Sequence, residues 1–243
     1  MSFPVYWLDE PAERPVGASV VLGGPEARHA VTVRRTRVGE HVELVDGTGI
    51  RLCCAVTSVG PATLTAEVES VVHEPEPSPR LVVVQALAKG DRSELAVETV
   101  TEIGADVVVP WQASRCVVQW RGDRGAKSLA RWRSTALAAA KQARRARVPE
   151  VTSLAATPEV AGLVAGASLP VVLHESASVP LSSLHVPDRG DVVVVVGPEG
   201  GISPEELAAF GVEPVRLGAT VLRTSTAGLA ACAALLSRTP RWS

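Results

Sequence analysis

The residues best suited to chemistry lie in three loops, each of which follows a short apolar run. The first loop, GPEGG (197–201), follows DVVVVV (191–196) and precedes a predicted helix. Glycines let a backbone approach a ligand closely, and a turn between a strand and a helix is the usual ligand position in an open α/β sheet. The loop has neither the Gly-Lys-Ser/Thr of a Walker A motif nor GxGxxG spacing. It indicates a ligand site of another kind, and the alternative is a tight turn without a ligand.

The other two loops contribute side chains that could act on a substrate. In LGATVLRTSTA (217–227), Arg223 precedes a predicted helix, where its charge opposes the helix dipole. A carboxylate or phosphate partner is therefore expected, and the alternative is an ordinary surface arginine. In LHES (173–176), His174 is either a base or a loop histidine held by hydrogen bonds, and the second interpretation is favoured.

Strand patterns place these loops at the ends of a mainly parallel sheet. Apolar, β-branched runs alternate with segments of helical periodicity, as in α/β folds. Runs that are apolar throughout predict strands covered on both faces. SPEE (203–206) predicts a helix start with a capping box, and Gly211 predicts the end of that helix. The predicted strands are 81–87, 106–110, 115–119, 169–174, 191–197 and 213–218.

The segment EPEPSPR (74–80) divides the chain, because its three prolines can continue neither a helix nor a central strand. Before it, alternation predicts strands at 41–45, 50–59 and 63–72, with a turn at Asp46-Gly47 and a short helix at 25–35. We therefore expect a small β-barrel domain over residues 1–73, a linker over 74–80, and an α/β domain over 81–243.

The charge of the chain is unevenly distributed. The formal net charge is -2, but residues 115–147 hold ten basic side chains and one acidic one, so the remainder carries -11. Such an excess departs from the alternating charges of an ordinary exposed helix and favours phosphate contacts over a merely solvated face. Aromatic residues make up only 3%, which argues against modules that stack several bases on rings. A second basic cluster lies beside His29 and comprises Arg28, Arg34, Arg35 and Arg37.

Several classes of protein are excluded by composition. Four cysteines without CxxC or Cys/His spacing predict neither a disulfide framework nor a metal site. The first fifteen residues lack the basic and apolar regions of a signal peptide, and no apolar run is long enough to span a membrane. A cytoplasmic protein without metal or membrane partner is expected.

Taken together, GPEGGISPEEL (197–207) and LGATVLRTSTA (217–227) resemble the ribosomal RNA small subunit methyltransferase E family. These are bacterial 16S rRNA uracil-N3-methyltransferases of the SPOUT superfamily. His29 with Arg35 resembles the family's His-x5-Arg element, and Arg115-Cys116 resembles its short RC element. KGDRSELAVETVTEIGA (89–105) and QARRARVPE (142–150) are similar to two further elements, so that the resemblance covers nearly the whole chain.

The resemblance implies a fold, a cofactor and partners. The expected fold is a PUA-like β-barrel followed by an α/β SPOUT methyltransferase domain with a C-terminal deep trefoil knot, working as a homodimer. The expected cofactor is S-adenosylmethionine, and the expected partner is the 16S rRNA of the small ribosomal subunit. The resemblance assigns cofactor binding to Leu173, His174, Gly197, Gly200, Gly201, Ile202, Leu217, Gly218 and Leu222. It assigns RNA binding, with the basic clusters, to His29, Arg35, Arg115, Lys141, Arg144, Arg145 and Arg147.

Methyl transfer to N3 of uracil requires loss of the N3 proton, so a base or a group that stabilises the uracil anion is needed. Arg223 is the candidate for stabilising the anion, and Glu199 and His174 are candidate bases. Glu199 could instead serve as a carboxylate that stabilises the turn.

The chain departs from the family pattern at several positions. It has Ser225 where relatives have glutamate, Lys141 and Arg144 where Glu and Gly are common, and Glu98-Thr99 where Gln-Lys is common. Two alternatives therefore stay open. One is a catalytically impaired RNA-binding accessory protein of the same fold, and the other is an α/β enzyme acting on a phosphorylated small molecule.

Overall fold

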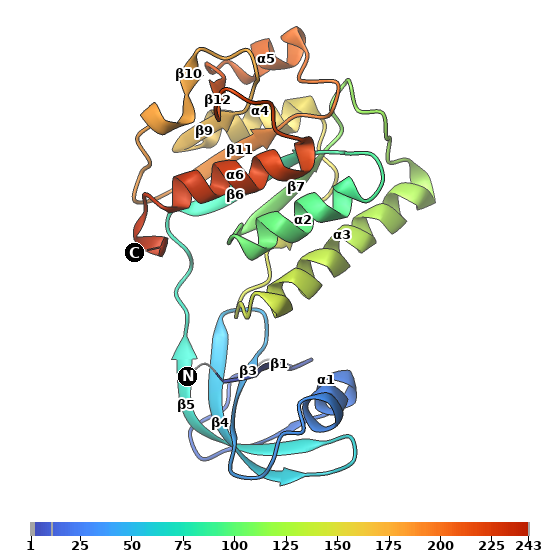
Figure 1. The fold of residues 1–243 in the computed structure, drawn as a ribbon, viewed down its shortest axis with the longest axis vertical. Coiled ribbons are helices and arrows are strands. Elements are labelled where there is room, and N and C mark those ends of the chain that lie inside the picture. The colour runs from blue at the N-terminus through green and yellow to red at the C-terminus, as the bar shows by residue number, and fades with distance from the viewer. Residues whose placement is uncertain (1–2, 11, 243) are drawn as a thin grey trace. The chain divides into compact units, whose positions relative to one another are not determined.

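The computed structural model describes residues 3–10 and 12–242, which form two compact units. Unit 1 comprises Met1–Glu76 and Ala140–Val148, and unit 2 comprises Pro77–Ala139 and Pro149–Ser243 (Figure 1). The boundary between Glu76 and Pro77 lies inside the segment where the prolines predict a linker. The segment 140–148, by contrast, belongs to unit 1 although it lies far beyond that linker.

Unit 1 is built on a five-stranded sheet with the strand order β1-β3-β4-β5-β2. Its strands are β1 (Val5–Trp7), β2 (Ser19–Leu22), β3 (His41–Val45), β4 (Ile50–Val59) and β5 (Leu64–His73). The alternation in β5 is a genuine burial pattern, because Leu64, Ala66 and Val68 are buried while Glu67 and Glu69 are exposed. The predictions for β3, β4 and β5 are confirmed to within one residue at each end.

The helix predicted at 25–35 is a short α-helix, α1 (Gly24–Arg28), that continues into a π-helix, η1 (His29–Val33). It stops where Arg35 adopts the left-handed conformation, with φ of 55°. The helical segment packs Ala27 and Ala30 into the unit 1 core and leaves His29 and Arg34 exposed.

The segment 140–148 is held in unit 1 by apolar packing. Ala140 and Ala146 form a buried cluster with Trp7 and Val45. The segment includes the last residues of α3 (Gly122–Gln142) and the turn that follows. Arg144 in this turn is also left-handed, with φ of 53°.

Unit 2 is built on a parallel sheet with the strand order β8-β7-β6-β11-β9. Its strands are β6 (Arg80–Ala86), β7 (Val107–Trp111), β8 (Glu150–Val151), β9 (Leu169–Val172) and β11 (Asp191–Val196). A separate pair joins β10 (Val179–Pro180) to β12 (Val215–Arg216). The valines of β11 are almost fully buried, as expected for a strand covered on both faces.

Helices cover the unit 2 sheet. They are α2 (Arg92–Glu102), the first part of α3, α4 (Thr157–Gly166), α5 (Pro204–Phe210) and α6 (Thr224–Leu236), with the 3-10 turns η2 (Leu181–Ser183) and η3 (Pro240–Trp242). Helix α6 lies beside α2 on one face, over β6 and β11 (Figure 1). The close approach needs Gly228, where a Cβ would lie 3.1 Å from Val100 and 3.4 Å from Val196.

The strand predicted at 115–119 is wrong. These residues form a loop between β7 and α3, in which Cys116 is buried but Val117 is 73% exposed. The apolar run is too short to distinguish a strand from a loop that tucks one side chain into the core. The strand predicted at 213–218 is reduced to the two residues of β12.

Candidate active site

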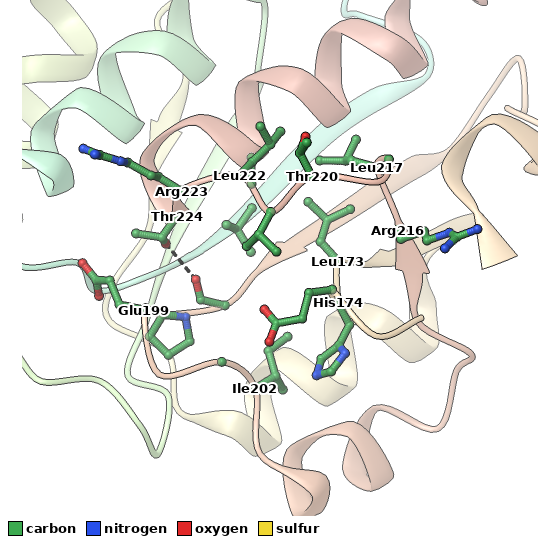
Figure 2. A pocket seen from close by; sticks show the side chains of 18 of the residues that line it. Leu173, His174, Glu199, Ile202, Arg216, Leu217, Thr220, Leu222, Arg223 and Thr224 are labelled. Atoms are coloured by element: carbon green, nitrogen blue, oxygen red, sulfur yellow. Dashed lines mark hydrogen bonds between the residues drawn. The ribbon is translucent and has the colours of Figure 1, made fainter. Parts of the chain in front are cut away.

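A pocket of about 280 Å³ lies where the three loops meet, at the carboxyl ends of β9, β11 and β12 (Figure 2). We call it the loop pocket. Strands β9 and β11 end at the same edge of the parallel sheet, and a parallel bridge between Leu173 and Val215 brings the end of β12 beside them. All the residues predicted to bind a cofactor line this pocket except Gly200; they are Leu173, His174, Gly197, Gly201, Ile202, Leu217, Gly218 and Leu222.

Hydrogen bonds through Thr224 tie two of these loops to the centre of the sheet. The Thr224 hydroxyl donates to the Gly197 carbonyl at 2.7 Å (Figure 2) and accepts from Gln85 Nε2 at 3.1 Å. Gln85 belongs to β6 and is fully buried. The GPEGG turn and the start of α6 therefore share one anchor on the central strand. Sequence analysis missed this anchor, and a polar residue inside the apolar run of β6 was its only local signal.

The start of α5 fixes the other side of the GPEGG turn. Ser203 and Glu206 form the predicted capping box, and Gly211 ends the helix at φ of 64°, so both predictions are confirmed. Glu206 is buried and also accepts hydrogen bonds from the Ser114 backbone (2.7 Å) and the Thr157 hydroxyl (3.2 Å). These hydrogen bonds join Glu206 to the start of α5 and to the neighbouring segments at Ser114 and Thr157, so the role of Glu206 is to anchor α5.

Glu199 lines the loop pocket and is held at its rim. Its Oε1 accepts from the Lys89 backbone N–H at 3.3 Å and lies 3.8 Å from Arg92 Nη1. Arg92 also lines the pocket and was not singled out from the sequence, although it lies within the family-like element 89–105. These contacts let Glu199 stabilise the turn, and its carboxylate still borders the pocket.

Arg223 lies directly before α6, in an extended conformation, and its side chain is exposed. In Figure 2 its guanidinium points away from Leu173 and Leu217, at the outer margin of the loop pocket. A cation at this place is unfavourable next to the helix N-terminus. It is accessible to an anion that enters the pocket from outside.

His174 is fixed by its neighbours. Its Nδ1 accepts from the Ser176 backbone N–H at 3.3 Å and lies 2.9 Å from the Ser176 hydroxyl, while its backbone N–H donates to Val215 at 2.9 Å. In the neutral ring the proton therefore resides on Nε2. This arrangement matches the interpretation of His174 as a hydrogen-bonded loop histidine.

The residues predicted to bind RNA divide between the two units. Arg115 is in unit 2, where its guanidinium donates to the Gly200 carbonyl at 3.2 Å, and a Cβ on Gly200 would lie 3.1 Å from the Arg115 backbone. Gly200 therefore faces Arg115 rather than the loop pocket. Arg115 supports the GPEGG turn from behind.

The other predicted RNA contacts are in unit 1. His29, Lys141 and Arg144 border a pocket of about 370 Å³, which we call the basic pocket. Arg35 is exposed and Arg145 is half-buried. Arg147 packs against Gly49 and donates to the Glu74 carbonyl at 2.7 Å, which gives it a structural role. The basic pocket is lined by Pro4, Val5, Tyr6, Trp7, Glu26, His29, Arg34, Lys141, Gln142 and Arg144.

Burial raises the pKa of three cysteine thiols, Cys54 and Cys232 to about 12 and Cys116 in the same direction. These thiols stay protonated and inert at neutral pH. Within residues 3–10 and 12–242, no group of His, Cys, Asp and Glu side chains is arranged to hold a metal ion. In the same ranges no helix is long and apolar enough to cross a membrane.

Comparisons with known proteins agree with the geometry of the two units. The RNA methyltransferase domain family matches residues 74–236, and the RNA methyltransferase PUA domain family matches residues 22–69. A solved ribosomal RNA small subunit methyltransferase E from Neisseria gonorrhoeae, bound to S-adenosyl methionine, superposes with a TM-score of 0.81 at 29% identity, covering 97% of this chain and 98% of that one. A methyltransferase from Legionella pneumophila in complex with the cofactor SAM gives a TM-score of 0.81 at 25% identity, over 98% and 99% of the two chains.

Sequence relatives give the same family. Ribosomal RNA small subunit methyltransferase E from Bacillus subtilis is 29% identical, over 90% of each chain. The protein of that name from Mycobacterium tuberculosis is 46% identical over 233 residues, covering 93% of this chain and 89% of the relative. The fold is thus that of an α/β RNA methyltransferase with a PUA domain, and the chain belongs to the ribosomal RNA small subunit methyltransferase E family.

Proposed function

We propose that the protein transfers a methyl group from S-adenosylmethionine to N3 of a uridine in the 16S rRNA of the small ribosomal subunit. The observation that carries this proposal is the loop pocket, because it lies at the strand ends of a domain whose solved relative from Neisseria gonorrhoeae is bound to S-adenosyl methionine. The expected compartment is the cytoplasm, where the small ribosomal subunit is assembled.

The residues of the loop pocket fit this cofactor. Leu173, Ile202 and Leu217 offer apolar surface for a flat base, and the open space beside Gly218 lets a ligand approach the backbone. Gly197 packs closely against Ile202, because a Cβ there would lie 2.7 Å from Ile202 Cγ1. When bound, S-adenosylmethionine supplies an electrophilic methyl group on a sulfonium. The protein aligns the uridine with it, and such alignment contributes about 7–11 kcal/mol in well-oriented reactions.

Arg223 stabilises the negative charge that develops on uracil when N3 loses its proton. Arg223 lines the loop pocket, and its exposed guanidinium is accessible to a substrate that approaches from outside. A positioned donor of this kind contributes roughly 10²–10³ in rate. Glu199 is proposed as the proton acceptor, and His174, with Nδ1 already accepting from Ser176, is the second candidate.

Ser225 does not take the place of the family's glutamate in the pocket. It is 3% exposed, lies in the first turn of α6, and is absent from the described lining of the loop pocket. The catalytic residues proposed above are present without it. The family membership of the chain and its S-adenosyl methionine-bound relative do not favour the catalytically impaired accessory protein or the enzyme for a phosphorylated small molecule.

The finer features of the fold are part of the same proposal. We also propose that the segment after β12 threads through a loop of the preceding chain before α6 packs back on β6 and β11, as a trefoil knot requires. We also expect a homodimer. Sedimentation of the purified protein tests the dimer, since a monomer at micromolar concentration would contradict it.

The decisive experiment is methylation of small ribosomal subunits that lack the modification, with the product nucleoside identified by mass spectrometry. N3-methyluridine at one position is the expected product. Calorimetry with S-adenosylmethionine provides the binding control. A different methylated nucleoside, or cofactor binding without methyl transfer, would contradict the proposed reaction.

A further inference from the structure

The basic pocket of unit 1 has the composition of a nucleotide site. It lies wholly in unit 1, so that its geometry does not depend on unit 2. Three permanent cations (Arg34, Lys141 and Arg144) and one carboxylate (Glu26) line it. This local excess of positive charge belongs to a chain whose formal net charge is -2. The pocket therefore attracts an anion where the protein as a whole does not.

Contacts through Glu26 connect the residues of the inner wall of the basic pocket. Trp7 is 6% exposed, and its backbone N–H donates to Glu26 Oε2 at 3.1 Å. Glu26 Oε1 accepts from Lys141 Nζ at 2.9 Å, and this ammonium lies 5.8 Å from the centre of the Trp7 ring. Glu26 thus fixes strand β1 and the end of α3 together. The buried Trp7 Nε1 has no hydrogen-bond partner among the described residues.

The mouth of the basic pocket offers a flat ring. His29 is exposed, and its imidazole lies edge-on to the buried Tyr6 ring, with 6.4 Å between centroids. Bases that are splayed out of single-stranded RNA stack on such rings, and their phosphates bind nearby arginines. A duplex cannot insert a base into a pocket, so the shape selects an unpaired nucleotide.

Arg144 occupies a position where glycine is normally found. The Arg144 N–H donates to Lys141 and the Arg145 N–H to Ala140, which is the Schellman pattern of a helix end. The residue at this position is left-handed, with φ of 53°, and glycine adopts that conformation without strain. Among the described residues Arg35 is the one other non-glycine with positive φ, and it too ends a helical segment of unit 1. Because glycine would adopt this conformation without strain, the strained backbone at Arg144 points to a function for the arginine side chain.

We propose that the basic pocket binds one unpaired nucleotide of the RNA substrate, away from the uridine that is methylated. The base stacks at His29, and its phosphate meets Arg144 and Arg34. This inference rests on the proposed function for the identity of the RNA. It adds a second contact point, which holds the substrate while the loop pocket performs the chemistry.

The variant Arg144→Gly tests the proposal, because relief of backbone strain should favour the folded state whereas loss of the guanidinium should weaken RNA binding. Relief of the left-handed arginine should leave the thermal midpoint unchanged or raised. The apparent KM for small subunits should rise about tenfold with kcat unchanged, and the salt slope of rRNA binding should fall by roughly 0.7–0.9. Arg189→Ala, which removes an exposed charge from unit 2 outside both pockets, is the matched control and should change neither.

Three outcomes would overturn the proposal. One is an unchanged KM and salt slope for Arg144→Gly. Another is weaker binding to intact subunits with unchanged binding to protein-free rRNA, since the pocket would then meet a ribosomal protein. The third is a thermal midpoint that falls in parallel with affinity, which would mean that Arg144 only holds the fold. The salt slope of RNA binding is measured without cofactor, so a failure of methyl transfer would leave this part of the test intact although no KM could then be measured.

A second measurement asks whether a base is recognised. The indole N–H resonance of Trp7, assigned with Trp7→Phe, reports on the pocket that Trp7 lines. Uridine monophosphate should shift this resonance, and Arg144→Gly should abolish the shift. Inorganic phosphate should have no comparable effect. An equal shift with phosphate alone would show an anion site that ignores the base.

Discussion

The loop pocket and the basic pocket differ in the residues that line them. The loop pocket is lined largely by glycine and apolar residues at strand ends, and at Gly197 there is no room for a side chain. The basic pocket combines apolar and aromatic residues with the charged side chains of Glu26, Arg34, Lys141 and Arg144, and Arg144 remains where glycine would be unstrained. A cofactor whose structure does not vary can be bound closely by backbone groups. A long polyanion can instead be bound by charged side chains that project from a stable domain. If this comparison is correct, damage to one pocket should spare the function of the other.

The largest effect is expected for Arg223→Ala. Loss of its charge should lower single-turnover methyl transfer roughly 10²–10³-fold, because the developing anion loses its donor. Affinity for S-adenosylmethionine and for rRNA should stay within about twofold, since most of each binding site is untouched. Transfer of a labelled methyl group to subunits measures the rate. Unchanged turnover would remove Arg223 from the catalytic residues.

Gly197→Ala should mainly reduce cofactor affinity. The new Cβ would lie 2.7 Å from Ile202 Cγ1, and overpacking of this kind costs about 1–3 kcal/mol, or roughly 5–150-fold in affinity if the loop carries the strain. Calorimetry measures the change. Gly162→Ala in α4 is the control, because its Cβ meets open space and a helical alanine should stabilise by about 0.5–1 kcal/mol. Equal cofactor affinity in both variants would contradict a tight cradle at Gly197.

Thr224→Val tests the anchor behind the loop pocket. It removes the hydroxyl that joins the Gly197 carbonyl to Gln85 and leaves both groups without that partner. The free energy of unfolding should fall by about 1–3 kcal/mol, and cofactor affinity should fall with it. Chemical denaturation measures the first quantity. Thr57→Val, an exposed strand residue of unit 1, should stay within about 0.5 kcal/mol of wild type, and rRNA binding should be unaffected in both.

Asp46→Ala tests the turn of unit 1 that Asp46 stabilises. Its expected effect, on the free energy of unfolding, is the smallest in this series. Burial raises the pKa of Asp46, but hydrogen bonds from Thr48, Ala12 and Ile50 outweigh it and hold the pKa below its ordinary value of 3.8. Its stabilisation is therefore present above pH 3.8 and is lost as pH falls through the lower folded value. The variant should lose about 1 kcal/mol at pH 6 and converge with wild type in acid.

Calorimetry from about pH 2 to pH 7 measures this convergence. Asp46→Asn keeps an acceptor for the turn and should lose less stability, without the pH dependence. A constant gap between wild type and Asp46→Ala across the range would show that the carboxylate charge is irrelevant. Cofactor affinity should not change in either variant, because Asp46 belongs to unit 1.

Local sequence patterns were sufficient for much of the fold. Alternation of polar and apolar residues predicted β3, β4 and β5, and the valine run predicted β11. A strand buried on one face alternates in the sequence, and a strand buried on both faces is apolar throughout. The capping box at Ser203 and Glu206 identified the start of α5 from four residues. The run at 115–119 failed, since one buried cysteine between exposed neighbours imitates a strand.

The loop pocket was also largely predictable, but its supports were not. The family resemblance assigned the loops 173–177, 197–202 and 217–223 to one cofactor site, and residues of all three loops line the loop pocket. Arg92 and the anchoring role of Thr224 were missed, because these roles depend on Glu199 and Gln85, which lie more than a hundred residues away along the chain.

By itself the sequence determined the strand and helix pattern, the glycine loop, the basic excess of 115–147 and the family resemblance. Only the tertiary structure decided that residues 140–148 belong to unit 1, where Ala140 and Ala146 pack against Trp7 and Val45. It also decided that Arg115 and Arg147 support loops while Arg144 borders a pocket. Periodicity and turn chemistry are local and can be read along the chain. Which distant segments share a core depends on long-range packing, which no local pattern specifies.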